Sequence, residues 1–147
     1  MAKVTSLGYL GIGVSDLAAW KTHALGVLGI EVIERGSRLD LRYDEQVWRL
    51  SLAASGEDDL TFIGLEVNSI EALEALAKAL KEKGISVDQG SEALCAERGV
   101  SAMICCEDPF GLAVELYVGE RLAGNPFKPA REHAGFVTGD MGLGHIV

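Results

Sequence analysis

The residue with the clearest chemical potential is His145, in the segment Gly142-Leu143-Gly144-His145-Ile146-Val147. A neutral imidazole presented by a close-packed strand is a common metal ligand. One imidazole does not hold a catalytic divalent metal, because such sites use about three protein ligands. The segment resembles the first half of a metal site whose other ligands would lie outside these residues, and spacing alone also fits an ordinary strand histidine at His145. On this expectation the 147 residues are a piece of an enzyme.

Length, composition and charge bound the class of protein. A chain of 147 residues with 48% apolar residues is long enough for one domain with a substantial core. The net charge of −9 disfavours nucleic acid and anionic lipid as partners. No apolar run reaches the ~18 residues of a membrane span. The three cysteines have no metal-type spacing, which fits reduced thiols in the cytoplasm.

The elements that must position any site come from an internal repeat. The repeated segments are residues 9–32 and 62–87. Each is expected to form a strand, a capped helix and a second strand. Ser15 and Asn68 are the predicted helix N-caps, with Glu71 completing a capping box with Asn68. Gly29 and Gly84 stand where a helix C-cap requires a positive φ.

Each repeat is expected to continue with short strands, so that both read βαβββ. The expected strands are 30–35, 39–43, 46–53, 85–88, 100–106 and 112–119, with helices at 70–83 and 92–97. The turn signals Gly36-Ser37 and Asp108-Pro109-Phe110-Gly111 separate strands. Strand character is expected to resume at 135–138 and 142–147. The predicted boundaries are 1–119 for a two-module domain (modules about 5–54 and 59–119), 120–138 for a linker and 139–147 for the start of a second, metal-binding domain.

Side chains alternate across a strand, so each predicted strand has two distinct faces. Aliphatic residues dominate one face and are expected to pack on the helices. The other face carries glycines, aromatic residues and one acid. Tyr9, Phe62 and Glu115 are expected to meet on this second, concave side.

These features together resemble the vicinal oxygen chelate superfamily, which includes glyoxalase and bleomycin-resistance proteins. Within it, the chain is similar to the N-terminal domain of type I extradiol dioxygenases, particularly the 2,3-dihydroxybiphenyl 1,2-dioxygenase group. The segments that carry the resemblance are 6–9, 14–20, 98–100, 108–112 and 139–145. The resemblance implies an α+β fold in which two βαβββ modules pair into a half-barrel.

The resemblance also implies an iron(II) enzyme that opens catechol rings with dioxygen. In the family only the second domain holds the metal, through a His-His-Glu triad, and His145 matches its first ligand. The other two ligands and the acid/base residues would follow Val147. The expected function is therefore the non-catalytic N-terminal domain of such a dioxygenase, supporting the catalytic half.

The same alignment places a degenerate metal site in these residues. Tyr9 takes the first ligand position, Phe62 the second and Glu115 the third. Phenylalanine cannot ligate and neutral tyrosine is a poor ligand at pH 7. We therefore expect no catalytic residue, cofactor or metal in this part, and Glu115 as a relic bonded to Tyr9 or to a nearby arginine.

Two other functions remain as alternatives. One is a free-standing binding or resistance module of the same superfamily, whose acidic groove would suit a cationic ligand. The other is a lyase or isomerase with metal sites between subunits, which would need ligands at more than Glu115 alone. Because open sheet edges template pairing, a homo-oligomer is expected, with 142–147 swapped, docked on a neighbour or disordered.

Overall fold

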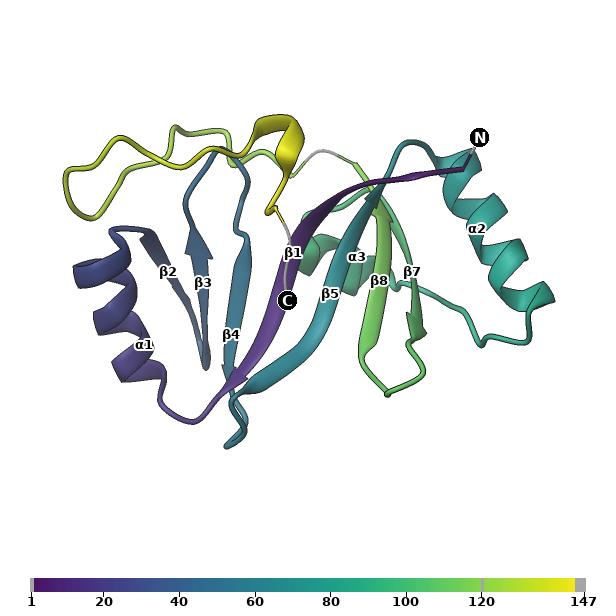
Figure 1. The fold of residues 1–147 in the computed structure, drawn as a ribbon, viewed down its shortest axis with the longest axis horizontal. Helices are drawn as coiled ribbons and strands as arrows, with labels where there is room; N and C mark the ends of the chain where they lie inside the picture. The colour runs from purple at the N-terminus through teal and green to yellow at the C-terminus, as the bar shows by residue number, and fades with distance from the viewer. Residues whose placement is uncertain (1, 120, 145–147) are drawn as a thin grey trace. The chain divides into compact units, whose positions relative to one another are not determined.

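The computed structural model describes residues 2–119 and 121–144 (Figure 1). These residues form two compact units, each containing one βαβββ module. The first unit comprises Tyr9–Thr61 and Leu122–Met141. The second comprises the described residues among 1–8, 62–121 and 142–147. Within the described parts of both units, no helix is long and apolar enough to cross a membrane.

The first unit is built on four strands and one helical segment. In chain order these are β1 (Val4–Val14, of which residues 9–14 belong to this unit), α1 (Leu17–His23), the π-helical η1 (Ala24–Leu28), β2 (Glu31–Arg35), β3 (Arg38–Arg42) and β4 (Leu50–Ala54). The strand order is β2-β3-β4-β1. Strand β1 pairs with β4 in parallel, whereas the pairs β3–β4 and β2–β3 are antiparallel.

The second unit repeats this arrangement. Its elements are β5 (Asp59–Val67, of which residues 62–67 belong to this unit), α2 (Ile70–Glu82), β6 (Asp88–Gln89), α3 (Glu92–Arg98), β7 (Ala102–Glu107) and β8 (Ala113–Val118). The strand order is β6-β7-β8-β5, again with one parallel pair, β5–β8, and two antiparallel pairs. The register aligns Gly64 with Glu115, as Gly11 aligns with Ser51 in the first unit. The predicted repeat and α+β fold are confirmed.

The N-caps lie one residue beyond the predicted positions. Asp16 caps α1 and Ser69 caps α2, each accepting a hydrogen bond from the amide three residues on. The predictions of Ser15 and Asn68 were therefore wrong, and so was the capping box. In the case of Ser15, its amide and hydroxyl instead donate to the carboxylate of Asp58, at 2.8 Å each.

The turns form at the glycines and at the residues 108–111, where the sequence predicts them. Gly29 ends the first helical segment at φ 70° and Gly84 follows α2 at φ 79°, the left-handed conformation that favours glycine. Between β7 and β8, the amide of Gly111 donates to the carbonyl of Asp108. The Asp108 carboxylate also accepts from the amides of Phe110 and Leu112, which stiffens the predicted turn.

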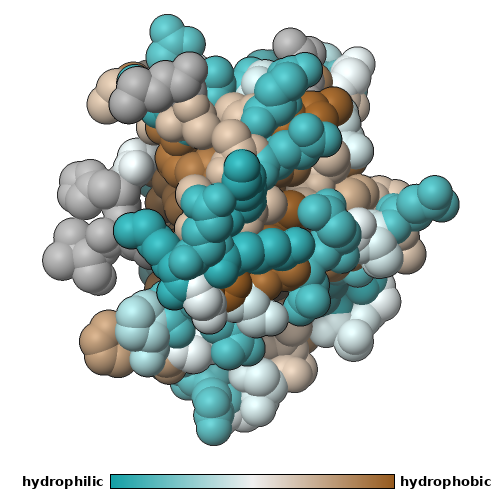
Figure 2. Space-filling view, turned by 90° about the vertical axis from the view of Figure 1, so that its right-hand side faces the viewer, coloured by the Kyte–Doolittle hydropathy of each residue, from teal (hydrophilic) through white to brown (hydrophobic). Residues whose placement is uncertain are grey.

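Each unit has its own hydrophobic core between its helix and one face of its strands. In the first unit the buried residues are Val14, Ala24, Ile30, Leu39, Leu41 and Leu52. In the second they are Val67, Ala72, Leu73, Ala77, Val87, Ile104 and Leu116. The prediction that the aliphatic strand faces pack on the helices is confirmed. Figure 2 faces the α2 side of the second unit, where hydrophilic side chains cross the surface with hydrophobic areas between them.

Residues 122–141 cross one end of β2, β3 and β4 in the first unit (Figure 1). The amide of Ala123 donates to Glu45 and that of Ala130 to Gly29, both through backbone carbonyls. The strand expected at 135–138 does not form, and a 3₁₀ turn, η2 (Gly139–Met141), follows it. Positive φ values at Gly135 and Gly139 interrupt the extended backbone that a strand needs.

The segment 142–144 does not form the expected strand either. Gly142 and Gly144 both have positive φ. The amide of Leu143 donates to the carbonyl of Leu7 in the same chain, at 2.8 Å. These residues are thus docked on their own unit, and the expectation of a swapped or disordered segment was wrong for them. His145 lies outside the described residues.

Candidate functional site

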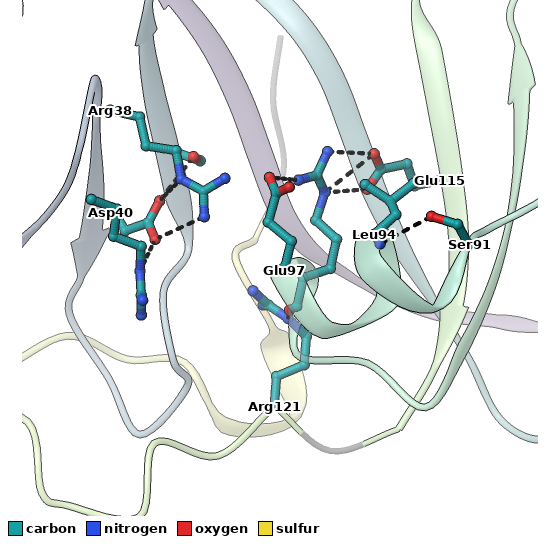
Figure 3. Close-up of polar contacts among 10 residues, drawn as sticks. Arg38, Asp40, Ser91, Leu94, Glu97, Glu115 and Arg121 are labelled. Atoms are coloured by element: carbon teal, nitrogen blue, oxygen red, sulfur yellow. Dashed lines mark hydrogen bonds and ion pairs between the residues drawn. The ribbon is translucent and has the colours of Figure 1, made fainter.

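Glu115 lies on β8 with only 5% of its surface exposed. Its carboxylate, labelled in Figure 3, forms an ion pair with the guanidinium of Arg98. The Nε of Arg98 donates to Oε2 at 2.9 Å, and Nη2 donates to Oε1 at 2.9 Å. This two-point geometry is the strong form of the arginine–carboxylate pair. The expected arginine partner of Glu115 is therefore confirmed.

Arg98 is positioned by backbone as well as by side-chain contacts. It is the last residue of α3, and Gly99 closes the helix at φ 72°. The carbonyl of Arg98 accepts a 2.7 Å bond from Nε of Arg121, whose side chain is almost fully buried. The remaining nitrogen, Nη1, donates to Glu97 at 2.6 Å. All three guanidinium nitrogens are thus engaged.

Phe62 completes the environment of this guanidinium. The central carbon of Arg98 lies 4.1 Å from the centroid of the Phe62 ring. A cation at this distance is attracted by the electron-rich face of the ring. In the structure, Phe62 and Glu115 therefore both contact the guanidinium of Arg98, which is a positive group of the chain itself.

Tyr9 lies in the first unit and is fully buried. Its ring centroid is 5.0 Å from that of Trp48, with the planes tilted by 56°. Trp48 is also almost fully buried, as expected for a core residue. In this unit Tyr9 is thus part of an aromatic packing pair.

The first unit holds a buried carboxylate of its own, which the sequence analysis missed. Asp40 on β3 is fully buried and accepts from Ser51 at 2.9 Å. Arg35 donates to Asp40 at 2.7 Å, and Arg38 lies 3.2 Å from it. Ser51 is opposite Asp40 in the β3–β4 register, the position that Glu115 holds opposite Cys105 in the second unit. In the sequence, the alternating charges of Arg38, Asp40 and Arg42 could have indicated this buried carboxylate.

The described residues do not fit an iron site. Among them, no group of three or more histidine, cysteine or acidic side chains is placed to hold a metal. Phe62 offers no donor atom, and both oxygens of Glu115 already accept from Arg98. A side chain that is fully paired with a guanidinium is a poor candidate for a metal ligand or a general acid.

The cysteines have packing roles rather than reactive ones. Cys105 and Cys106 are unpaired neighbours on β7, and alternation sends them to opposite faces. Cys106 packs against the core of the second unit, whereas Cys105 lies opposite Glu115. Burial raises the pKa of both thiols above the usual value, which lowers the fraction of nucleophilic thiolate at neutral pH.

A cavity of about 510 Å³ lies in the first unit beneath residues 122–141. Tyr43, Arg49, Phe127 and Phe136 are among the residues that line it. Arg49 donates to Asp44 at 2.6 Å, and both side chains are buried. Burial is the main cause that raises the pKa of Tyr43 to about 12, although the charge of Arg49 acts in the opposite direction.

His133 fastens residues 122–141 to the rest of the first unit. Its Nδ1 accepts from the amide of Gly135 at 2.9 Å, which leaves the proton on Nε2. Nε2 then donates to the carbonyl of Gly29 at 3.0 Å. The ring also packs edge-on against Phe136. No chemistry was assigned to His133 from sequence, and these contacts give it a structural role.

Comparison with known proteins finds similarity to extradiol dioxygenases. The model of the family "Dihydroxybiphenyl dioxygenase BphC D1" matches residues 7–54. The biphenyl-2,3-diol 1,2-dioxygenase of Pseudomonas sp. strain KKS102 is 38% identical over 98% of this chain and 50% of its own length. The 3-methylcatechol 2,3-dioxygenase of Pseudomonas putida F1 is 40% identical, with the same two coverages. The chain thus spans about half the length of these curated relatives.

Solved structures agree with the sequence matches. A crystal structure of a catechol 2,3-dioxygenase superposes with a TM-score of 0.92 at 42% identity, over 98% of this chain and 52% of that one. A manganese-bound glyoxalase from Novosphingobium aromaticivorans, at 22% identity, shares the fold with a TM-score of 0.71. These matches support an N-terminal domain of a type I extradiol dioxygenase.

Proposed function

We propose that this chain is the non-catalytic N-terminal half of an iron(II)-dependent extradiol dioxygenase that cleaves 2,3-dihydroxybiphenyl-like catechols. The observation that carries the proposal is the match of 98% of the chain to half of each of two such enzymes, at 38 and 40% identity. Dioxygen would be the second substrate. The protein would act in the cytoplasm as a homo-oligomer.

In this proposal the domain boundaries follow the sequence analysis. Residues 1–119 form the two-module domain, 120–138 the linker, and 139–147 the start of the metal-binding half. His145 would be the first iron ligand, with two more ligands after Val147. Tyr9, Phe62 and Glu115 would be the degenerate counterparts of those ligands.

The residues described here would support catalysis without taking part in the reaction. The bound iron would supply the chelation of the catechol and the activation of dioxygen. The arginine–carboxylate contacts of the second unit would help to hold the folded domain together. The pairing of Glu115 with Arg98 supports the assignment of no metal to this half.

The first experiment compares the 147-residue chain with the full natural chain, both loaded with iron(II). We expect the full chain to form the yellow ring-fission product from 2,3-dihydroxybiphenyl and the 147-residue chain to form none. Circular dichroism must show that the shorter chain is folded. Product formation by the 147 residues alone would overturn the proposal.

A second experiment addresses Glu115. In the full chain, Glu115→Gln is expected to reduce stability but to keep the iron content at one equivalent, as measured by mass spectrometry. Loss of stoichiometric iron in this variant would mean that Glu115 is a ligand. A thermal-shift screen with catechols and cationic antibiotics tests the alternative of a binding module, which predicts a response to the antibiotics only.

A further inference from the structure

We propose that the cavity of about 510 Å³ in the first unit is a binding site for a small, neutral, planar aromatic compound that carries an amide or hydroxyl group. The lining residues come from the connection between β3 and β4, residues 43–49, and from the segment 122–141. A compound in the cavity therefore touches two segments that are far apart in the sequence. Neither iron nor ring cleavage takes part, so the site is independent of the proposed function.

Three aromatic residues give the cavity an apolar wall. Tyr43, Phe127 and Phe136 all belong to its lining. The ring centroid of Phe136 lies 5.2 Å from that of Tyr43 and 6.4 Å from that of Phe127, with the planes tilted by 55° and 60°. Phe136 nevertheless keeps 44% of its surface exposed, so it has room for a further contact. A planar ring gains most from such a wall, because aromatic pairs favour stacked and edge-to-face contacts.

Polar side chains of Tyr43, Gln46 and Thr138 complete the lining. Among the residues that the structure describes, none forms a hydrogen bond with the two hydroxyls or with the Gln46 amide. Burial is the main cause of the raised pKa of Tyr43, and the charges of Arg49 and Asp44 also act on it, which places the hydroxyl near these two lining residues. An amide or hydroxyl group on the bound compound supplies the donors and acceptors that these side chains can use. The volume also lies within the roughly 300–1,000 Å³ of small-molecule sites.

The charges around the cavity favour a neutral compound over an ion. Asp44 and Arg49 are paired at 2.6 Å, and their side chains are only 8% and 5% exposed. The remaining charge of the lining is on Glu45, whose side chain is 67% exposed and therefore screened by water. An ion that entered the cavity would lose its hydration without gaining an unmatched buried counter-charge. A neutral compound avoids this penalty.

The test uses the full natural chain and benzamide, a neutral planar ring with an amide group. Isothermal titration calorimetry should show saturable binding. At ten times the dissociation constant, the folding equilibrium constant should increase by about eleven-fold, which is measured as a rise in melting temperature. Benzamide should also slow limited proteolysis within residues 122–141, because the bound ring connects this segment with residues 43–49. No saturable binding, or no protection of this segment, would overturn the proposal.

Two variants locate the binding site. Phe136→Ala removes part of the aromatic wall, and Tyr43→Phe/Thr138→Val removes two hydroxyls while it keeps the shape of the cavity. Each should weaken benzamide binding by at least about five-fold. Thr61→Val, at an exposed position on β5, is the control and should bind as the wild type does. Benzamide bound at an iron site would be affected by none of these changes, so unchanged affinity in both variants would contradict the cavity as the site.

Three analogues of similar size test the chemistry of the compound on the unaltered protein. Cyclohexanecarboxamide keeps the amide but lacks the planar ring, and it should bind more weakly than benzamide. Benzamidine and benzoate keep the ring but carry a positive and a negative charge, and both should also bind more weakly. Equal binding of the cyclohexyl compound would remove the role of the rings, and tighter binding of either ion would show that the site is not one for neutral compounds.

Discussion

At the scale of single residues, buried charges are matched by guanidinium groups. Glu115 and Asp40 are both buried, and each is bonded to arginine within its own unit. Breaking such a pair from one side leaves an uncompensated charge, whereas removing both partners leaves none. This difference gives a direct energetic test of the Arg98–Glu115 pair.

Glu115→Gln is expected to lower the free energy of unfolding by less than about 3–5 kcal/mol, the range for leaving a buried charge uncompensated, because Arg98 keeps its hydrogen bond to Glu97. Arg98→Met/Glu115→Gln should cost less than this single change. Urea unfolding of both variants and of Arg98→Met, combined as a double-mutant cycle, measures the coupling. Additive losses in the two single variants would show that the pair contributes nothing as a pair.

The raised pKa of Tyr43 predicts how the stability of the chain changes at alkaline pH. Its pKa is raised to about 12 in the folded state, above the ordinary value of 10.0. Between these pH values the unfolded chain loses the proton and the folded chain keeps it, so stability should fall as pH rises from about 10 to 12. Ultraviolet difference titration should show a tyrosine ionising near pH 12. That component should be absent in Tyr43→Phe, and its persistence there would contradict the assignment.

At the scale of elements, close contacts inside each unit constrain the strands and the segment 122–141. Gly8 on β1 lies against the ring of Tyr117, which is 98% buried. His133 connects the segment 122–141 with the end of the first helical segment. Each contact predicts a loss of stability that a control variant elsewhere in the chain should not show.

Gly8→Ala is expected to destabilise the chain by about 1–3 kcal/mol, the usual cost of overpacking. A Cβ at this position would meet the Tyr117 hydroxyl oxygen at 1.9 Å, so the ring must move. Gly26→Ala is the control, because a Cβ there meets nothing within 4 Å and φ is not positive. Urea unfolding should separate them. Equal midpoints for the two variants would contradict the packing argument.

His133→Ala is expected to cost about 1–2 kcal/mol, since it removes two hydrogen bonds at a half-buried site. Residues 122–141 should become more sensitive to limited proteolysis before the rest of the chain unfolds. His23→Ala, at an exposed position on α1, serves as the control and should change stability by less than about 0.5 kcal/mol. Unchanged cleavage of the segment in His133→Ala would show that it is held by other contacts.

At the scale of the whole molecule, the chain spans about half the length of its curated relatives, and the proposed function assigns catalysis to a longer natural chain. We expect the full natural chain to elute from size-exclusion chromatography as a homo-oligomer. Several copies provide mutual cover for open strand edges. A strict monomer at micromolar concentration would contradict this expectation.

The sequence by itself determined the repeat and the module type. These depend on local signals, such as alternating strands, amphipathic helices and left-handed glycines, which recur in both modules. It also singled out Glu115 as the acid in the second unit and an arginine as one possible partner. Local sequence preference could not decide which of the neighbours Ser15 and Asp16 caps helix α1. Asp16 is the cap, because Ser15 instead bonds to Asp58, which is distant in the sequence.

Only the tertiary structure decided which side chains meet. Arg98 reaches Glu115 across seventeen positions of chain, and Ser51 reaches Asp40 across eleven. Strand periodicity places a residue on a face, but the register and the end of α3 select its partner. The segment 135–144 shows the same limit: its residues suggested strands, whereas a 3₁₀ turn and docking on Leu7 prevail. The long-range pairing of buried charges and backbone groups depends on the free energy of the whole folded chain, and no local sequence pattern specifies it.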